Sequence, residues 1–415
     1  MLGCIMARTA MTMSSGGRIS EHLSVGILAR SYPRDRIRKI LQRLNANSQR
    51  VRDLPAEVLV YYVISLGLFM AVSTGEVLRC LVEGLSWLGG LRQNINIAGK
   101  SAISQARTRL GSAPLKALWT ESVGVIAKPE QPGCFYKGMR LVCMDGSTLD
   151  VPDTAENFEH FGHQRASRGQ AAFPQLRFVS LCESGTHAMF AVQMGAYKVS
   201  EATLAAEVLP LLQSDMLCIA DRFYSTFPLW QRSLQTGASL LWRARSNATL
   251  AADAVLADGS YLSTLYPTLK DKRRRQNGTV VRVIEYELRG VEHSEPVYRL
   301  ITNLLDPVQW PAQELAALYA QRWEIETALD EFKTHMRGGR VVLRSKTPVL
   351  VEQEFYGMML AHWAVRSLMN EAAQKEHIDP DRLSFTHSIR VIRRKLASLP
   401  ALSPSSPARV DARSH

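Results

Sequence analysis

Residues 319–336 read YAQRWEIETALDEFKTHM, and this segment decides how the rest of the chain is interpreted. It contains no Pro or Gly and consists mostly of good helix formers, so it predicts one continuous α-helix. At about 100° per residue, Tyr319, Arg322, Glu326 and Lys333 fall on one narrow stripe of that helix. A hydroxyl, a guanidinium, a carboxylate and an ammonium group would therefore share one face.

The same segment carries three further acids. Asp330 lies close to the stripe, whereas Glu324 and Glu331 point roughly 120–140° away from it. Glu326 and Asp330 are spaced i, i+4, so their charges repel each other unless a cation lies nearby. That cation could be Arg322, as in an ordinary solvated helix, or a metal ion in a site. Helix geometry leaves both interpretations open and does not choose between the two acids.

Charge is unevenly distributed along the 415 residues, which have room for two or three domains. The formal net charge is +12, which favours a polyanionic partner over a merely soluble basic protein. Residues 1–135 carry a net charge of +9, residues 136–370 carry none, and residues 371–415 carry +3. This pattern predicts that the binding surface and the chemistry are partly separated.

The cysteines and the apolar segments indicate the cellular compartment. The six cysteines are scattered, without a C-x-x-C pair or zinc spacing, which favours free thiols in a reducing cytoplasm. The N-terminus lacks a charged start followed by an apolar core, so no signal peptide is expected. The longest apolar run, residues 58–72, is shorter than the ~20 residues that span a bilayer. We therefore expect a cytoplasmic protein with no membrane contact.

The N-terminal third is predicted to be helical, over residues 21–130, after a disordered segment of residues 1–20. Its last polar helix, GKSAISQARTRLG at residues 99–111, carries Arg107 and Arg109 and ends at a glycine. This arrangement fits the DNA-reading element of a helix-turn-helix module. It fits a capped surface helix equally well.

From residue 137 onward the pattern changes to strands, followed by strand–helix alternation. This alternation over residues 137–246 indicates an α/β layer architecture. Residues 247–308 alternate as strands around a basic loop, KDKRRRQNG, and predict a β-rich insertion. Helices resume over residues 309–398, and the Pro- and Ser-rich residues 399–415 predict a disordered tail.

Two aspartates stand at the ends of apolar strands. Asp145 lies in LVCMDGST, before a glycine where a sheet edge is expected, and Asp221 closes the apolar run MLCIAD. Acids at the carboxyl ends of strands in open α/β sheets often line ligand-binding crevices. Alternatively, Asp221 pairs with Arg222 or caps the next helix. With a helical acid, these two would make a carboxylate set that suits a hard divalent ion such as Mg²⁺ rather than zinc.

These motifs together resemble bacterial DDE transposases of the insertion-sequence-4 family. The family signature of Tyr, two residues, Arg, three residues, Glu, six residues and Lys is matched by Tyr319, Arg322, Glu326 and Lys333. Its aspartate blocks are similar to MDGSTLDVPDTAENFEHFG and LCIADRFYSTF, and LPAEVLVYYVISLGLFM is similar to its helical N-terminal domain. The resemblance covers roughly residues 22–398.

The resemblance implies an RNase H-like mixed-sheet core with a β-strand insertion, preceded by a helical DNA-binding domain. It implies that Asp145, Asp221 and Glu326 are the catalytic metal ligands, which selects Glu326 over Asp330. The cofactor would be Mg²⁺, with Mn²⁺ possible, in a two-metal site. Tyr319, Arg322 and Lys333 would contact the transposon end.

The implied activity is cleavage at the ends of an insertion sequence and transfer into target DNA, through a hairpin intermediate and with a homodimer on paired ends. The competing interpretation is a catalytically inactive relative that binds DNA as a repressor. The intact acids and signature argue against it. In relatives a tryptophan of the insertion stacks on a flipped base. Trp242 and Trp310 flank the insertion here, and each is expected in the core instead.

Overall fold

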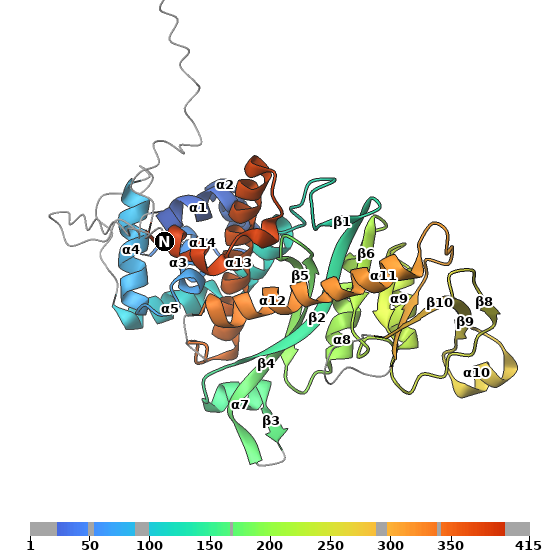
Figure 1. The fold of residues 1–415 in the computed structure, drawn as a ribbon. Coiled ribbons are helices and arrows are strands. Elements are labelled where there is room, and N and C mark those ends of the chain that lie inside the picture. The colour runs from blue at the N-terminus through green and yellow to red at the C-terminus, as the bar shows by residue number, and fades with distance from the viewer. Residues whose placement is uncertain are drawn as a thin grey trace, which may run out of the picture.

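The computed structural model describes residues 23–48, 54–87, 99–166, 169–287, 297–337 and 342–394. The segments predicted to be disordered, residues 1–20 and 399–415, lie outside the described residues. A group of N-terminal helices lies beside one large mixed sheet (Figure 1). Within the described chain, no helix combines the length and apolar character that crossing a membrane requires.

The sheet has eleven strands in the described chain, ordered β3-β4-β2-β6-β7-β11-β10-β9-β8, with β1 on β2 and β5 on β4. Strands β4 and β5 pair antiparallel to their neighbours, whereas β6 and β7 run parallel to β2. This is the mixed α/β sheet expected of an RNase H-like core, so the predicted fold class is confirmed. The strands are β1 (Phe135–Tyr136), β2 (Met139–Asp150), β3 (His163–Ala166), β4 (Gly169–Glu183), β5 (Ala188–Ala196), β6 (Met216–Ala220), β7 (Ser239–Arg243), β8 (Ala254–Val255), β9 (Tyr261–Leu265), β10 (Thr279–Tyr286) and β11 (Tyr298–Thr302).

Both faces of the central strands are buried, which explains their nearly continuous apolar sequence. Residues of β2 alternate between two hydrophobic cores, with Leu141 and Cys143 in one and Val142 and Met144 in the other. The core around Val142 is covered by α8 (Glu201–Val208) and α9 (Phe227–Leu234). The opposite face is crossed by α11 (Ala312–Tyr319) and α12 (Trp323–Asp330), as Figure 1 shows.

The N-terminal helices pack on the long helix α13 (Pro348–Glu376), far away in sequence. Helices α3 and α13 approach so closely that a Cβ added at Gly67 would lie 2.9 Å from the Cα of Met358. A Cβ at Gly357 would lie 2.8 Å from the backbone oxygen of Val63. Glycine is therefore required at both positions for the helices to touch. The remaining helices are α1 (Leu23–Ser31), α2 (Arg34–Arg43), α3 (Ala56–Leu68), α4 (Thr74–Trp87), α5 (Lys100–Leu110), α6 (Ala113–Ser122), α7 (Ala155–Phe161), α10 (Leu269–Arg274) and α14 (Phe385–Arg394).

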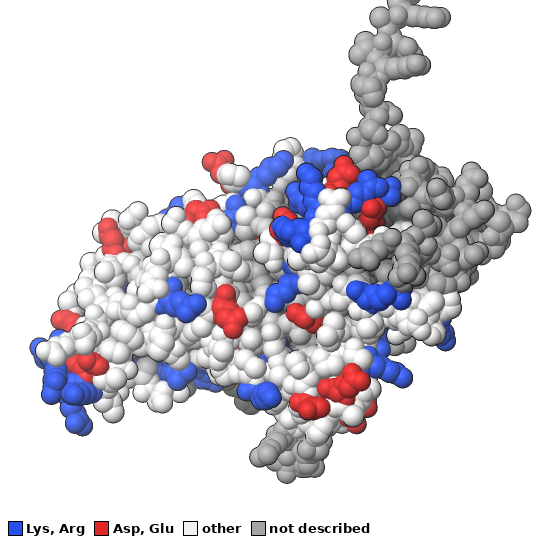
Figure 2. All heavy atoms as spheres, turned by 180° about the vertical axis from the view of Figure 1, so that it is seen from behind, with Lys and Arg blue, Asp and Glu red and all other residues white. Residues whose placement is uncertain are grey.

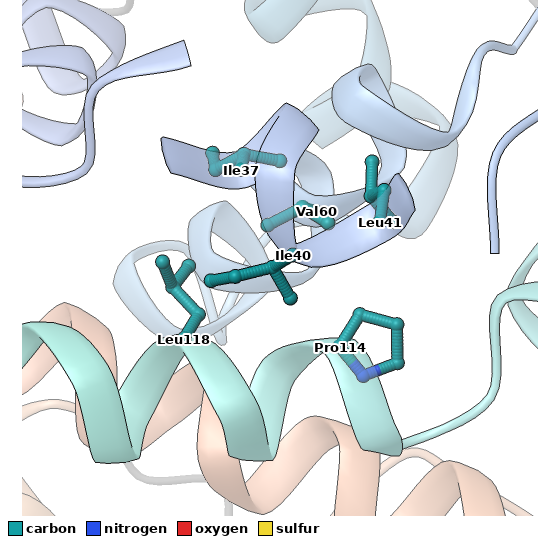
Figure 3. Close-up of a pocket in the computed structure, with 6 residues that line it drawn as sticks. All are labelled: Ile37, Ile40, Leu41, Val60, Pro114 and Leu118. Atoms are coloured by element: carbon teal, nitrogen blue, oxygen red, sulfur yellow. The ribbon is translucent and has the colours of Figure 1, made fainter. Parts of the chain in front are cut away.

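A small hollow lies between α2, α3 and α6 (Figure 3). It is lined only by apolar side chains: Ile37, Ile40, Leu41, Val60, Pro114 and Leu118. With no polar group to orient a ligand, it is a seam between packed helices rather than a binding site.

The strands predicted as an insertion extend the main sheet, because β11 pairs antiparallel with β7. The basic segment predicted as a loop is instead the short helix α10, which begins where the Thr268 hydroxyl accepts a hydrogen bond from the Asp271 N–H. The helix ends at Arg275, whose φ is +53°. Seen from behind, Lys and Arg side chains gather at the end of the molecule where α10 lies (Figure 2).

The helix predicted over residues 319–336 is not continuous, which corrects the first expectation. A 3₁₀ turn, η3 (Ala320–Arg322), separates α11 from α12, and a π-helical turn, η4 (Glu331–His335), follows α12. Three residues complete a 3₁₀ turn, so Arg322 lies almost directly in line with Tyr319. Lys333 lies within the π turn, where each residue advances by less than the about 100° of an α-helix.

Candidate active site

The ends of three adjacent parallel strands align at one edge. Met144 of β2 pairs with Ala220 of β6, and Ala220 pairs with Trp242 of β7. The next residues are Asp145, Asp221 and Arg243, and neighbouring strands lie about 4.8 Å apart. Both aspartates therefore lie side by side, with Arg243 at the end of the next strand and its guanidinium over the ring of Tyr298. The structure differs from the prediction in one detail, because β2 does not end at Asp145. It continues to Asp150, paired with β4 and, at Asp150, with Val342.

The two aspartates are half-buried and crowded by negative charge. Burial raises the pKa of Asp145 to about 7, helped by the charges of Asp221 and Glu201 and opposed by the Gly146 N–H and Arg322. The Gly146 N–H lies 2.8 Å from the Asp145 Oδ1. The Asp221 Oδ1 accepts a hydrogen bond of 2.6 Å from the Phe223 N–H. This carboxylate therefore also stabilises the turn that follows β6.

Arg322 connects the signature helix to the aspartates. Its Nη1 lies 2.6 Å from the Oε1 of Glu326, and it is electrostatically coupled to Asp145. Burial lowers the pKa of Arg322, but Tyr319, Glu326 and Asp145 outweigh it and raise the pKa overall. The ion-pair interpretation of Arg322 and Glu326 is therefore realised in the protein without DNA, and Glu326 is held by Arg322.

Tyr319 points its hydroxyl into the same region. The side chain is only 6% exposed, and its Oη has no hydrogen-bond partner in the described structure. Burial raises its pKa, and the hydroxyl is coupled electrostatically to Arg322, Asp221 and Arg243. A buried hydroxyl without a partner costs free energy, so this group is suited to bind something that approaches the aspartates.

The other helical acids lie elsewhere. Asp330 is exposed, and its Oδ2 lies 3.2 Å from the Nδ1 of His335. Lys333 is half-buried in η4, and within the described chain it takes part in no hydrogen bond or ion pair. Glu324 accepts a hydrogen bond from the Gly185 N–H on the opposite side of the helix, as the helical angle predicted.

Sequence reasoning missed a third carboxylate beside the aspartates, Glu201 at the start of α8. Its Oε1 accepts a hydrogen bond from the hydroxyl of Tyr224, three residues after Asp221. A Cβ added at Gly146 would lie 2.4 Å from the same oxygen. Arg243 was missed as well, although it follows an apolar strand as the aspartates do. That signal could have identified it.

Helix α5, which was predicted to contact DNA bases, carries one buried and one exposed arginine. Arg107 is 7% exposed, and it donates to the Gln353 Oε1 at 2.8 Å, the Ser345 Oγ at 2.9 Å and the Leu350 carbonyl. It anchors α5 to α13, so the expectation that Arg107 contacts DNA is wrong. Arg109 is exposed and remains available.

The tryptophans flanking the insertion are in or near the core, as expected. Trp242 is completely buried against Trp230, with ring centroids 5.2 Å apart. Trp310 is partly buried and packs on Tyr136. By contrast, Trp323 is 65% exposed beside Arg322, so its ring is open to a partner.

The donor chemistry suits a hard divalent cation, because Asp145 and Asp221 offer adjacent carboxylate oxygens whose mutual repulsion a cation would relieve. Among the described residues, however, no three His, Cys, Asp or Glu side chains are gathered closely enough to hold an ion. Glu326 is engaged by Arg322 instead. The two aspartates supply the kind of donors that a divalent cation prefers, whereas Glu326 would have to leave Arg322 to join them.

Comparisons with known proteins identify the family of this chain. Residues 22–120 match the family of insertion element 4 transposase N-terminal regions, and residues 136–364 match the transposase DDE domain. The chain is 32% identical over 362 residues to the transposase InsG for insertion sequence element IS4 of Escherichia coli (strain K12), which covers 86% of this chain and 79% of that protein. It is 23% identical over 233 residues to the putative transposase InsZ of the same organism, which covers 56% of this chain and 75% of that protein. Among solved structures, the piggyBac transposase synaptic complex with hairpin DNA covers 89% of this chain and 79% of its own, with a TM-score of 0.46 and 11% identity.

Proposed function

The chain belongs to the insertion-sequence-4 family of DDE transposases, and on that premise we propose that it cleaves the ends of an insertion sequence through Asp145, Asp221 and Glu326. The family implies a DNA-cleaving enzyme that depends on a divalent metal. The observation that carries the residue assignment is the alignment of Asp145 and Asp221 at the ends of two adjacent parallel strands, with Arg322 in electrostatic reach of Asp145.

We further propose that the metal is Mg²⁺, with Mn²⁺ as a substitute, held as two ions by the three carboxylates. When bound, such ions activate the attacking oxygen and stabilise the leaving oxygen of a phosphodiester. Glu326 completes the set after Arg322 releases it. A phosphate is the natural competitor for Arg322, because a guanidinium binds phosphate oxygens through two donors.

DNA binding would thus assemble the site. As the phosphodiester approaches, Arg322 exchanges the Glu326 carboxylate for a phosphate, and the Tyr319 hydroxyl gains the hydrogen-bond partner that it lacks. Lys333 and the exposed Arg109 supply further positive charge along the DNA, and Trp323 offers a face on which a base can stack.

The proposed reaction is cut-and-paste transposition. Water cleaves one strand at the transposon end and leaves a 3′-hydroxyl. This hydroxyl attacks the phosphodiester of the opposite strand, which forms a hairpin and releases the flanking DNA with a 3′-hydroxyl of its own. A second water opens the hairpin, and the freed 3′-hydroxyl attacks target DNA. One such site must act at each end, so we propose a homodimer on paired ends, in the bacterial cytoplasm.

Substitution of the carboxylates tests the assignment. The substrate is the terminal inverted repeat found in the DNA that flanks the coding sequence. Asp145→Ala, Asp221→Ala and Glu326→Ala should each abolish cleavage while end binding persists, because affinity comes mostly from phosphate contacts. Asp330→Ala is the matched control and should cut at nearly the wild-type rate. An inactive Asp330→Ala with residual nicking by Glu326→Ala would overturn the choice of acid.

A further inference from the structure

A completely buried tyrosine links the turns that carry the two aspartates. Tyr224 has no exposed surface, and its N–H donates to the Asp221 carbonyl. Its hydroxyl donates to the Oε1 of Glu201. Burial raises the pKa of Tyr224, and the charges of Asp145, Glu201 and Asp221 raise it further. The tyrosine hydroxyl therefore lies within electrostatic reach of all three carboxylates.

Glu201 also contacts the other aspartate-bearing strand. The Cα of Gly146, next to Asp145, has so little space in front of it that an added Cβ would lie 2.6 Å from the Cδ of Glu201. The even-numbered neighbours Val142 and Met144 face the core under α8, so Gly146 presents its bare face to that helix. The lack of a side chain at Gly146 is what lets the Glu201 carboxylate reach the strand ends.

Helix α8 is well fixed at this end. Its N-cap is Ser200, whose Oγ accepts a hydrogen bond of 3.1 Å from the Thr203 N–H. Glu201 is the first helical residue, so its direction is set by the cap rather than by a flexible loop. Leu204 and Ala205 of the same helix are buried in the core that contains Met144 and Ala220.

We propose that Glu201 is a positioning residue, which sets the separation of Asp145 and Asp221 by bridging the Tyr224 hydroxyl and the strand at Gly146. This inference rests on the proposed function, in which the two aspartates bind a divalent cation. Partners that orient metal ligands typically account for 10–100-fold in metal affinity or activity. Glu201 acts through Tyr224 and the strand at Gly146, so this role requires no direct contact with DNA.

The test uses the full-length protein and measures the rise in melting temperature with added Mn²⁺ or Mg²⁺, as well as cleavage of end DNA. A ligand that binds the folded state raises the melting temperature with its concentration. Glu201→Ala and Tyr224→Phe should each raise the metal concentration needed for half of the maximal rise by about tenfold or more. Glu201→Gln keeps an oxygen that can accept the tyrosine hydrogen bond and should recover most of the response.

Two comparisons separate positioning from a general loss of stability. The double variant Glu201→Ala with Tyr224→Phe should be no worse than either single variant, because both remove one shared interaction. Glu207→Ala removes a carboxylate at the other end of α8, where it accepts a hydrogen bond from Gln193, and should leave the metal response unchanged. A Glu201→Ala protein that melts earlier but keeps the wild-type metal response would overturn the inference.

The outcomes distinguish this inference from the proposed function. If wild-type protein neither cuts end DNA nor responds to metal, the assignment of Asp145 and Asp221 is wrong. If wild type responds, Asp145→Asn does not, and Glu201→Ala behaves as wild type, the metal site stands and Glu201 has no part in it.

Discussion

At the scale of single residues, the ion pair between Arg322 and Glu326 would compete with binding of a DNA phosphate by Arg322. In the protein without DNA, Arg322 pairs with Glu326, and a phosphate would need the same donors. Arg322→Ala should therefore reduce single-turnover cleavage by more than tenfold, with a smaller loss of end binding. Arg322→Lys should recover only part of the rate, because the forked geometry is gone. If the folded fraction of Arg322→Ala cuts at the wild-type rate, the ion pair only steadies the helix.

Ionisation of the buried Glu324 makes the free energy of unfolding depend on pH. Burial raises its pKa to about 7 from an ordinary 4.5, with help from Asp381 and Asp379 and against the Gly185 N–H. A raised folded-state pKa means that stability is full below about pH 4.5 and falls as the pH rises through 7. Glu324→Gln should therefore gain melting temperature relative to wild type across that window. A constant difference between pH 4 and pH 8 would contradict this.

The three proposed metal ligands share one property. Asp145 and Asp221 follow apolar strands, and Glu326 belongs to a spaced signature, so local sequence suffices for each. Glu201 lies 55 residues from Gly146, and nothing near it in sequence marks it as different from other helical acids. Its role appears only when α8 is placed behind the strand ends. Arg107 was misassigned for the same reason, since its partners lie on α13.

At the scale of elements, the π turn after α12 is built around a buried carboxylate. Glu331 is 5% exposed, and it pairs with Arg366 of α13. Its Oε1 lies 3.4 Å from the Nδ1 of His187, and its Oε2 lies 3.6 Å from the Nε2 of His362. Burial opposes ionisation, but these partners hold the pKa of Glu331 well below its usual range. The helix was predicted as continuous because these partners are distant in sequence.

Removing the charge of Glu331 from this buried cluster should strongly lower the stability of the protein. Glu331→Gln leaves the buried Arg366 without its counter-charge and should lower the free energy of unfolding by about 3–5 kcal/mol. Asp330→Asn, one residue earlier on the exposed face, should change it by no more than about 0.5 kcal/mol. Urea denaturation of both variants measures the difference. Equal small effects would mean that the cluster does not anchor the helix.

At the scale of the whole molecule, the helical N-terminal region is not independent of the rest. Val63 of α3 packs directly on Gly357 of α13, and Arg107 is hydrogen-bonded to the same helix. The composition of residues 21–130 suggested a separate domain, but composition cannot reveal that a distant helix completes its core. A fragment of residues 21–130 should therefore show no cooperative thermal unfolding by circular dichroism, whereas the full chain should. Cooperative melting of the fragment would refute this.

Residues 136–370 carry no net charge, but the folded protein gathers several of their basic side chains at one tip (Figure 2). In α10 and the residue after it, Lys270, Arg273, Arg274 and Arg275 are exposed, and no described carboxylate pairs with any of them. Four strand spacings, about 20 Å, separate β9 from β6, and the strand registers align Val283 of β10 with Ala220 of β6. Because α10 precedes the start of β10, the tip lies more than about 20 Å from Asp221. DNA that reaches the aspartates could therefore contact the tip several base pairs away.

A salt titration of DNA affinity decides whether the tip is used. Each phosphate contact that is lost lowers the slope of log affinity against log salt by about 0.9. The double variant Arg273→Ala with Arg274→Ala should reduce that slope by up to about 2 and weaken scrambled and end DNA alike, since phosphate contacts carry no sequence information. The matched double variant of the exposed Lys346 and Lys375 to Ala should keep the wild-type slope. Equal slopes for all three proteins would place the DNA path away from α10.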